Sequence, residues 1–313
     1  MKPVVISVPE QNRLGEALAY RLDAEVADAH IRSFPDGETY VRIDSPVDDR
    51  LVIVASSLTR PNDRFLPLYM IAESARDLGA GRVGLVAPYL SYMRQDDRFQ
   101  PGEGITSQYF AQLLSQTFDW LVTVEPHLHR RGALESIYSI PTRIVRAAGP
   151  IAGWIEDNVD DPILVGPDAE SEQWVSPIAE VGGFPSVVLD KVRRGDYDVD
   201  VEAPASVEWG GRQPVLIDDI ISTGGTMVEA VHLVVDRQLP PPVCIGIHGL
   251  FVGDALERLE ATGVRQIVTC NTVSHPTNAI DICGGLAEGV EKMIGDEVAV
   301  AVVSNREAGK ASP

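Results

Sequence analysis

The sequence predicts an α/β protein with two parallel sheets in tandem, and three observations carry this prediction. Short apolar runs with the length of buried strands recur along the chain. Amphipathic stretches with apolar residues at helical spacing lie between these runs. The alternation restarts in the second half of the chain. Strands that alternate with helices in this way form parallel sheets joined by helical crossovers.

The expected strands are rich in Val, Ile and Leu. In the first half they are 4–8, 51–55, 83–87 and 121–124, and in the second half 163–166, 187–189, 215–217, 243–247 and 267–269. Pro35-Asp36-Gly37 is a turn signal, and the β-rich segment Thr39–Ile43 follows it. We therefore expect residues 34–43 to form a protruding loop or hairpin on the first sheet.

The domain boundary is expected just before the second series of strands. The strand–helix rhythm restarts at Ile163, and the two halves have similar lengths. We predict an N-terminal α/β domain over 1–147, which carries the protruding loop, and a C-terminal α/β domain over 148–300. Residues 301–313 are predicted to be a tail.

Composition limits the classes of partner. The chain has 313 residues and a formal net charge of −20, so its field repels nucleic acid and anionic membranes, and we expect neither as a partner. No segment approaches the roughly 20 apolar residues of a membrane span. The three cysteines, Cys244, Cys270 and Cys283, form neither a disulfide framework nor a zinc pattern. Buried thiols in a reducing cytoplasm are the expectation, and hence a cytoplasmic location.

The strongest chemical signal is the segment 215–226. A buried strand ends in Asp218 and Asp219, a loop rich in Gly, Ser and Thr follows, and a helix begins near Met227. Amide groups of such a loop bind a phosphate, and glycines let the backbone approach it. The expected phosphate-binding residues are Ser222, Thr223, Gly224, Gly225 and Thr226, with Asp218 and Asp219 on sugar hydroxyls or a metal. A nucleotide P-loop would need a lysine, which is missing here. The weaker alternative is a plain turn with a solvated acidic edge.

Three other strand ends carry residues suited to phosphate or metal chemistry. Arg94, in the segment 88–96, can stack on a base and bind phosphate oxygens, although an Arg–Asp surface pair is an equal alternative. His127 and His129 suggest a capped loop or a soft-metal site, because Mg²⁺ prefers oxygen. Lys191 and Arg193 could neutralise a transferring phosphoryl group, and the alternative for them is a solvated basic turn.

The segment 215–226 resembles the ribose-phosphate motif of the type I phosphoribosyltransferase fold. Other segments narrow the resemblance to the ribose-phosphate diphosphokinases, and they extend from Phe34 to about Leu250. The similar segments are 34–38 (Phe-Ser-Asp-Gly-Glu in the family), 88–96 (Pro-Tyr-Phe-Gly-Tyr-Ala-Arg-Gln-Asp), 124–127 (the histidine of Val-Asp-Leu-His), 165–172 (Ser-Pro-Asp-Ala-Gly-Gly), 189–196 (Lys-x-Arg) and 247–249 (Thr-His-Gly).

The resemblance implies an Mg²⁺-dependent enzyme that transfers the β,γ-diphosphate of ATP to the C1 hydroxyl of ribose 5-phosphate. The products would be phosphoribosyl diphosphate and AMP. By resemblance, Phe34, Asp36, Glu38, Arg94, Gln95 and Asp96 bind ATP, His127 and Asp168 hold the metal, and Lys191 and Arg193 are catalytic. A homo-oligomer, dimer or higher, is also implied, because the family's Phe-containing loop serves a neighbouring subunit.

Two departures from the family pattern keep alternatives open. Glu170 and Ser171 replace a glycine pair beside the ATP phosphates, and Ser222 stands where the family often has aspartate. The first departure favours a non-catalytic regulatory relative of the family. A phosphoribosyltransferase is the other alternative, since it would share the segment 218–226 but needs neither the Phe34 loop nor Arg94.

Overall fold

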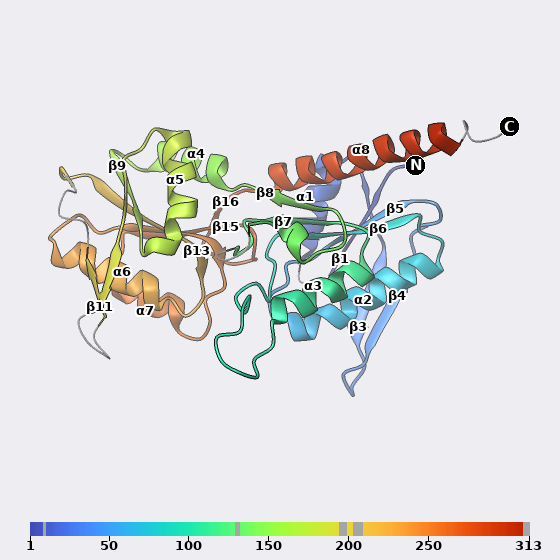
Figure 1. Cartoon of the computed structure of the whole chain (residues 1–313), viewed down its shortest axis with the longest axis horizontal. Coiled ribbons are helices and arrows are strands. Elements are labelled where there is room, and N and C mark those ends of the chain that lie inside the picture. Colours follow the sequence, from blue (N-terminus) through green and yellow to red (C-terminus); the bar gives the residue numbers. More distant parts are fainter. Residues whose placement is uncertain (9–10, 129–131, 194–198, 203–208, 309–313) are drawn as a thin grey trace. The chain divides into compact units, whose positions relative to one another are not determined.

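The structure is a computed structural model that describes residues 1–8, 11–128, 132–193, 199–202 and 209–308. The chain divides into two compact units. Unit 1 comprises Met1–Val145 with Cys283–Pro313, and unit 2 comprises Arg146–Ile282. Each unit contains its own six-stranded parallel sheet (Figure 1), which confirms the predicted α/β class with two parallel sheets. Within the described residues, no helix has the length and apolar character of a membrane span.

Unit 1 is built on the sheet order β2-β1-β5-β6-β7-β8, with every neighbouring pair parallel. Its strands are β1 (Val4–Ser7), β2 (Glu25–Val26), β5 (Leu51–Ala55), β6 (Arg82–Ala87), β7 (Leu121–Val124) and β8 (Thr142–Val145). Its helices include α1 (Asn12–Arg21), α2 (Pro61–Asp77) and α3 (Thr106–Thr117). The central strands read as continuous apolar runs because helices cover both faces of a parallel sheet.

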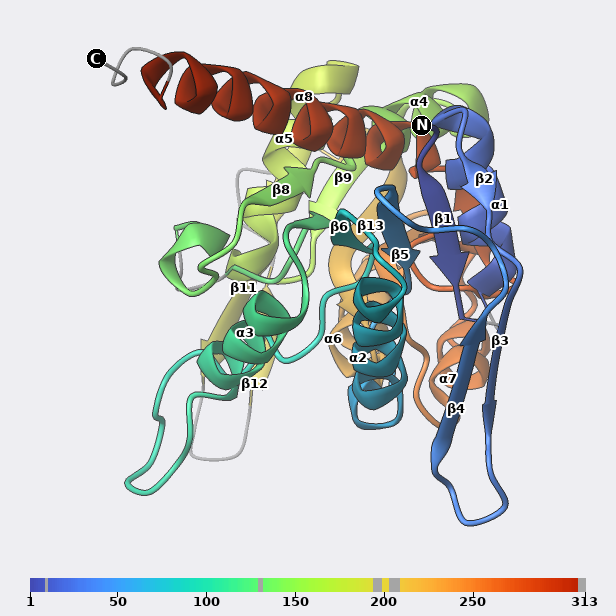
Figure 2. The same ribbon diagram turned by 90° about the vertical axis from the view of Figure 1, so that its right-hand side faces the viewer.

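The predicted hairpin is present. Strands β3 (Ala29–Ser33) and β4 (Thr39–Ile43) pair antiparallel, and Gly37 supplies the positive φ of +97° in the turn between them. Ile31 and Val41 pack against the unit 1 core, on the side of α2. Figure 2 shows the tip of the hairpin projecting beyond α2.

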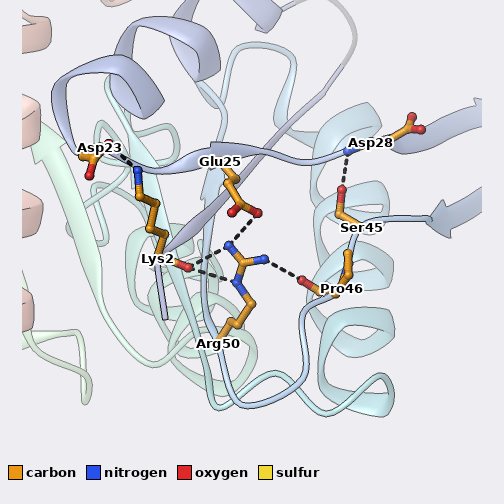
Figure 3. A network of polar contacts seen from close by, with 7 residues as sticks. All are labelled: Lys2, Asp23, Glu25, Asp28, Ser45, Pro46 and Arg50. Carbon is orange, nitrogen blue, oxygen red and sulfur yellow. Dashed lines mark hydrogen bonds and ion pairs between the residues drawn. The ribbon is translucent and has the colours of Figure 1, made fainter.

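A buried arginine ties the edge of this sheet together (Figure 3). Arg50 has a 7% exposed surface, and its Nε and Nη2 donate to the Lys2 carbonyl at 2.9 and 2.8 Å. Its Nη1 donates to the Pro46 carbonyl at 3.0 Å, and Glu25 lies 2.8 Å from Nη2. The guanidinium therefore joins the chain before β1 to β2 and to the segment that enters β5.

Unit 2 repeats the architecture with the order β10-β9-β13-β14-β15-β16. Its strands are β9 (Pro162–Gly166), β10 (Ser186–Val188), β13 (Gln213–Ile221), β14 (Val243–Gly249), β15 (Gln266–Cys270) and β16 (Asn278–Ile280). Its helices are α4 (Ala148–Asn158), α5 (Glu172–Gly182), α6 (Gly225–Asp236) and α7 (Ala255–Ala261), with a short 3-10 turn η3 (Ala169–Ser171). A separate ribbon pairs β11 (Asp190–Arg193) with β12 (Val199–Glu202).

The last helix differs from the expected organisation. Helix α8 (Cys283–Ala308) belongs to unit 1, not to a C-terminal domain over 148–300, and residues 301–308 are helical instead of forming a tail. It contacts β7 and β8 closely, since a Cβ on Gly285 would stand 2.7 Å from Val145 and one on Gly289 would stand 2.9 Å from Val122. The apolar pattern of a helix identifies its buried face but not the sheet that covers it. Residues 309–313 lie outside the described part.

Candidate active site

The loop between β13 and α6 has the geometry of an anion site. Gly224 adopts φ +76° as the N-cap of α6, and no side chain caps this helix end. Among the described residues, the amides of 223–226 have no backbone acceptor, and nothing lies within 4 Å of where a Cβ on Gly225 would stand. Thr223 is exposed. Unpaired amides at an accessible helix N-terminus bind phosphate groups.

The opposite side of this loop is held by hydrogen bonds. The Ile221 carbonyl accepts from the amides of Leu250 and Phe251 at 2.9 and 3.0 Å, and the Ser222 carbonyl accepts from Val252 at 2.9 Å. Arg258 of α7 donates from Nη2 to the Thr223 carbonyl at 3.0 Å. The carbonyls of Ile221, Ser222 and Thr223 are thus bonded to the protein, whereas the amides of 223–226 have no backbone acceptor among the described residues. Sequence reasoning missed Arg258, because nothing in the sequence links it to a carbonyl so far away along the chain.

The two aspartates at the end of β13 are not equivalent. Their side chains nevertheless interact, since Asp219 acts on the Asp218 carboxyl both by its charge and by a side-chain hydrogen bond. Burial raises the pKa of Asp218 well above its ordinary value, and the negative charges of Asp219 and Asp168 raise it further. The Asp219 amide donates to Asp218 Oδ1 at 2.9 Å. Asp218 is therefore a carboxylate whose charge is poorly compensated by the protein alone.

Asp168 lies on the loop after β9, the strand beside β13. Its side chain accepts from the Glu170 amide at 3.1 Å as the N-cap of η3, and the Ser171 hydroxyl donates to the Asp168 carbonyl. Ser171 is fully buried against Gly166, whereas Glu170 is exposed. The departure from the family's glycine pair thus forms a capping box, and the structure brings Asp168 close enough to Asp218 to influence its charge.

A buried histidine, His248, lies at the end of β14, and no role in the site was predicted for it from the sequence. His248 is 1% exposed, and its Nδ1 lies 2.9 Å from the Thr272 hydroxyl. That hydroxyl donates to the Ile247 carbonyl at 2.7 Å, so it accepts from an Nδ1–H of His248. The tautomer is fixed by this chain of hydrogen bonds. His248 lies beside Ile220 in the sheet register, one strand away from the phosphate loop.

In unit 1, the loops after β6 and β7 lie side by side, joined by the Val124 amide donating to the Pro88 carbonyl at 3.2 Å. Gln95 anchors the first loop to α3, since its side chain accepts from the Thr106 hydroxyl at 3.0 Å and its carbonyl from the Ser107 amide at 3.2 Å. Asp96 is buried and Arg94 is exposed. Of the predicted ATP-binding residues in this loop, Arg94 is the one that projects into solvent.

The remaining predicted residues are divided between the two units. Phe34, Asp36 and Glu38 lie at the exposed tip of the hairpin, where the Glu38 amide donates to Asp36 Oδ1 at 3.2 Å. His127 follows β7 in unit 1 and is partly buried, while Asp168 belongs to unit 2. Lys191 and Arg193 lie on β11, opposite Val201 and Val199, and their side chains, like His129, are outside the described part.

Neither predicted metal ligand belongs to the compact group of three ligands that the described residues contain. That group is Asp28, His30 and Asp44, at the root of the hairpin. All three are exposed, and Arg42 donates to Asp44 from Nε and Nη2 at 3.0 and 2.9 Å. An arginine that already neutralises one carboxylate weakens this group as a cation site.

Comparison with known proteins bears on both units. Residues 3–117 match the family model of the N-terminal domain of ribose phosphate pyrophosphokinase, and residues 133–283 match that of the phosphoribosyl transferase domain. Ribose-phosphate pyrophosphokinase, a synonym of ribose-phosphate diphosphokinase, is the name of two similar proteins. That of Methanopyrus kandleri is 32% identical, over 93% of this chain and all of that protein. That of Saccharolobus solfataricus is 34% identical, over 87% and 93%.

The fold has a counterpart among solved structures. A phosphoribosylpyrophosphate synthetase from Mycobacterium smegmatis superposes with a TM-score of 0.81 at 24% identity, covering 95% of this chain and 100% of that one. This likeness confirms the two-sheet architecture predicted from the sequence. The two family models and the identity over nearly full length show that the chain belongs to the ribose-phosphate pyrophosphokinase family of enzymes.

Proposed function

We propose that the protein transfers the β,γ-diphosphate of ATP to the C1 hydroxyl of ribose 5-phosphate, giving phosphoribosyl diphosphate and AMP. The observation that carries this proposal is the loop after β13, whose amides have no backbone acceptor among the described residues and whose open space at Gly225 suits a sugar phosphate. In this proposal Ser222, Thr223, Gly224, Gly225 and Thr226 hold the 5-phosphate, and Asp218 and Asp219 contact the ribose hydroxyls.

A divalent cation fits the acidic side of this site. Asp168 and Asp218 repel one another, and oxygen ligands of this kind are those that Mg²⁺ prefers. When bound, Mg²⁺ neutralises charge on the phosphates of ATP. We propose Asp168 as one of its ligands. His127 is the other proposed ligand, although an imidazole nitrogen is the less usual partner for this ion.

The other proposed roles concern binding and charge. Phe34, Asp36, Glu38, Arg94, Gln95 and Asp96 are proposed to bind ATP, and Lys191 and Arg193 to stabilise the transferring group. Phosphoryl transfer depends mainly on positioning and on charge stabilisation, which suits cationic side chains more than a nucleophile. We also propose a homo-oligomer and a cytoplasmic location. Three buried free cysteines are consistent with the latter.

One assay tests the proposal against its alternatives. The protein is mixed with MgATP and ribose 5-phosphate, and AMP and phosphoribosyl diphosphate are measured. A non-catalytic relative would form neither product. A phosphoribosyltransferase would consume phosphoribosyl diphosphate when given a base and would form no AMP from ATP.

A variant of the β11 segment tests the catalytic assignment in the same assay. Lys191→Ala should lower kcat by about 30- to 1,000-fold, which corresponds to roughly 2–4 kcal/mol of lost charge stabilisation in the transition state. The circular dichroism spectrum should be unchanged. Near-normal turnover would remove Lys191 from the catalytic residues while leaving the ribose-phosphate site in place.

A further inference from the structure

The tip of the hairpin contains an arginine packed on two aromatic rings. The Arg32 guanidinium carbon lies 4.8 Å from the centroid of the Phe34 ring and 4.4 Å from that of Tyr40. The two rings meet edge to face, with centroids 5.9 Å apart and an interplanar angle of 86°. Both distances from Arg32 are within the range of cation–π attraction, so the cation contacts both rings at once.

The strand register produces this arrangement. Arg32 is directly opposite Tyr40 in the β3–β4 pairing, so their side chains lie on the same face of the ribbon. Phe34 follows Arg32 by two residues and continues that face. The turn fixes the backbone of Phe34, because its amide donates to the Glu38 carbonyl at 2.7 Å and its carbonyl accepts from Gly37 at 2.9 Å.

The hairpin's other face is already occupied. Ile31 and Val41, which alternate with Arg32 and Tyr40 along the strands, pack against the core of unit 1. The outer face therefore contributes nothing to that core, and Phe34 remains 40% exposed. An aromatic ring at such a projecting tip needs a local contact to hold its orientation.

The Arg32 guanidinium packs on these two rings and on no recorded carboxylate of the described residues. Within the described part of the chain, the two rings are the partners recorded for its side chain. The neighbouring arginine on the same face behaves differently, since Arg42 forms a two-nitrogen contact with the Asp44 carboxylate. In a protein with 46 acidic residues, a cation packed on two rings instead of a carboxylate indicates that orienting the rings is its role.

We propose that Arg32 is a positioning residue for nucleotide binding. Its guanidinium holds the Phe34 ring against Tyr40 and leaves the exposed surface of the ring available to stack on the purine of ATP. This inference rests on the proposed function, because it takes Phe34 as part of the ATP site. It adds Arg32 and Tyr40, which have no counterpart in the Phe-Ser-Asp-Gly-Glu motif.

The test compares substitutions on one face of the hairpin. Arg32→Met keeps the length and apolar stem of the side chain but removes the cation, and should raise the KM for ATP about three- to tenfold. The KM for ribose 5-phosphate and kcat should stay within about twofold, because only the base-stacking ring is released. Arg32→Lys should recover part of the lost affinity, since an ammonium also binds a ring face.

Arg42→Met is the matched control, because it removes an arginine from the same face that pairs with Asp44 and meets the Tyr40 side chain but does not pack on the Phe34 ring, and it should leave both KM values unchanged. Phe34→Leu should raise the KM for ATP, and adding Arg32→Met to it should have no further effect. Equilibrium binding of a non-hydrolysable ATP analogue provides a readout independent of turnover, and melting temperatures check the fold of each variant.

The outcomes separate this inference from the proposed function. If Phe34→Leu weakens ATP and Arg32→Met does not, Arg32 has no positioning role and the proposed function stands. If Phe34→Leu leaves ATP affinity unchanged, the hairpin is not part of the ATP site and the inference fails with that assignment. If the wild-type protein forms no AMP, the proposed reaction is excluded, while analogue binding still decides the role of Arg32.

Discussion

Two charged groups, the buried Arg50 in unit 1 and the partly buried Asp218 in unit 2, have opposite electrostatic surroundings. Arg50 in unit 1 directs Nε, Nη1 and Nη2 onto two backbone carbonyls and also meets Glu25 (Figure 3). Asp218 in unit 2 accepts a hydrogen bond from the Asp219 amide but lies near two further negative charges, and its pKa is raised well above its ordinary value, first by burial.

The difference distinguishes a structural charge, that of Arg50, from one that we propose to be functional, that of Asp218. A buried charge whose donors are all satisfied joins elements together, and removing it leaves unpaired polar groups behind. A buried charge that the protein repels costs stability, and such groups are found where a ligand or ion completes their surroundings. A charged side chain near the end of a strand can therefore be structural or can await a ligand, and its hydrogen-bond and charge partners distinguish the two cases.

The largest effect on stability is expected at Arg50. Arg50→Met keeps much of the buried stem but leaves the carbonyls of Lys2 and Pro46 without their donor, so the free energy of unfolding should fall by about 2–4 kcal/mol. Urea denaturation followed by circular dichroism measures the change. Glu25→Gln is the control, and because Glu25 is 56% exposed its loss should cost less than about 1 kcal/mol. Equal losses in both variants would mean that the ion pair, not the carbonyl contacts, carries the stabilisation.

The next largest effect is expected on ligand affinity at Asp218. Asp218→Asn removes a charged acceptor from the proposed ribose site, so the affinity for ribose 5-phosphate should fall by about 10- to 100-fold, or roughly 1.5–3 kcal/mol. The affinity for an ATP analogue should change less than threefold. Calorimetric titration of each ligand separates the two. Equal losses for both ligands would assign Asp218 to a shared metal instead of to the sugar.

The sequence was sufficient for the central strands of both sheets but not for the short strands β2, β8 and β16, and the reasons are local. A buried parallel strand is a continuous apolar run, which is why the central strands could be predicted. The Gly224-Gly225 pair after two aspartates predicts a backbone that approaches an anion, and that role stays a prediction. The Pro-Asp-Gly turn also allowed the hairpin over 34–43 to be predicted. In each case the signal lies within about a dozen consecutive residues.

What the sequence did not reveal depends on contacts between distant segments. Helix α8 packs in unit 1 because two of its glycines allow close approach to β7 and β8, and a helical pattern does not specify its partner sheet. Arg258 of α7 donates to the carbonyl of Thr223, which lies 35 residues earlier in the loop between β13 and α6. The negative charge around Asp218 comes in part from Asp168, which lies at the end of a different strand.

A smaller effect, of opposite sign to that at Arg50, is expected on the stability of the Asp218 variant. The folded-state pKa of Asp218 is raised above the ordinary value of 3.8, so ionisation costs the folded protein free energy. This cost is absent well below pH 3.8, grows as the pH rises through that value, and is complete above the raised folded-state pKa. Asp218→Asn should therefore increase the free energy of unfolding by on the order of 1 kcal/mol at neutral pH, without ligand or Mg²⁺. Unfolding at a series of pH values checks it, and a gain that persists undiminished below pH 3 would contradict the charge explanation.

The smallest effect is expected beside Arg50 itself, at the exposed pair of Lys2 and Asp23. Their side chains lie 2.6 Å apart and are 54% and 85% exposed. Solvent screens such a pair, and ordering two mobile side chains offsets most of the attraction. Lys2→Met should change the free energy of unfolding by less than about 0.5 kcal/mol. The substitution keeps the backbone carbonyl of residue 2, to which Arg50 donates. A loss comparable to that of Arg50→Met would show that the Lys2 side chain orders the backbone carbonyl that Arg50 binds. In that case the difference in burial between Lys2 and Arg50 would not predict their contributions to stability.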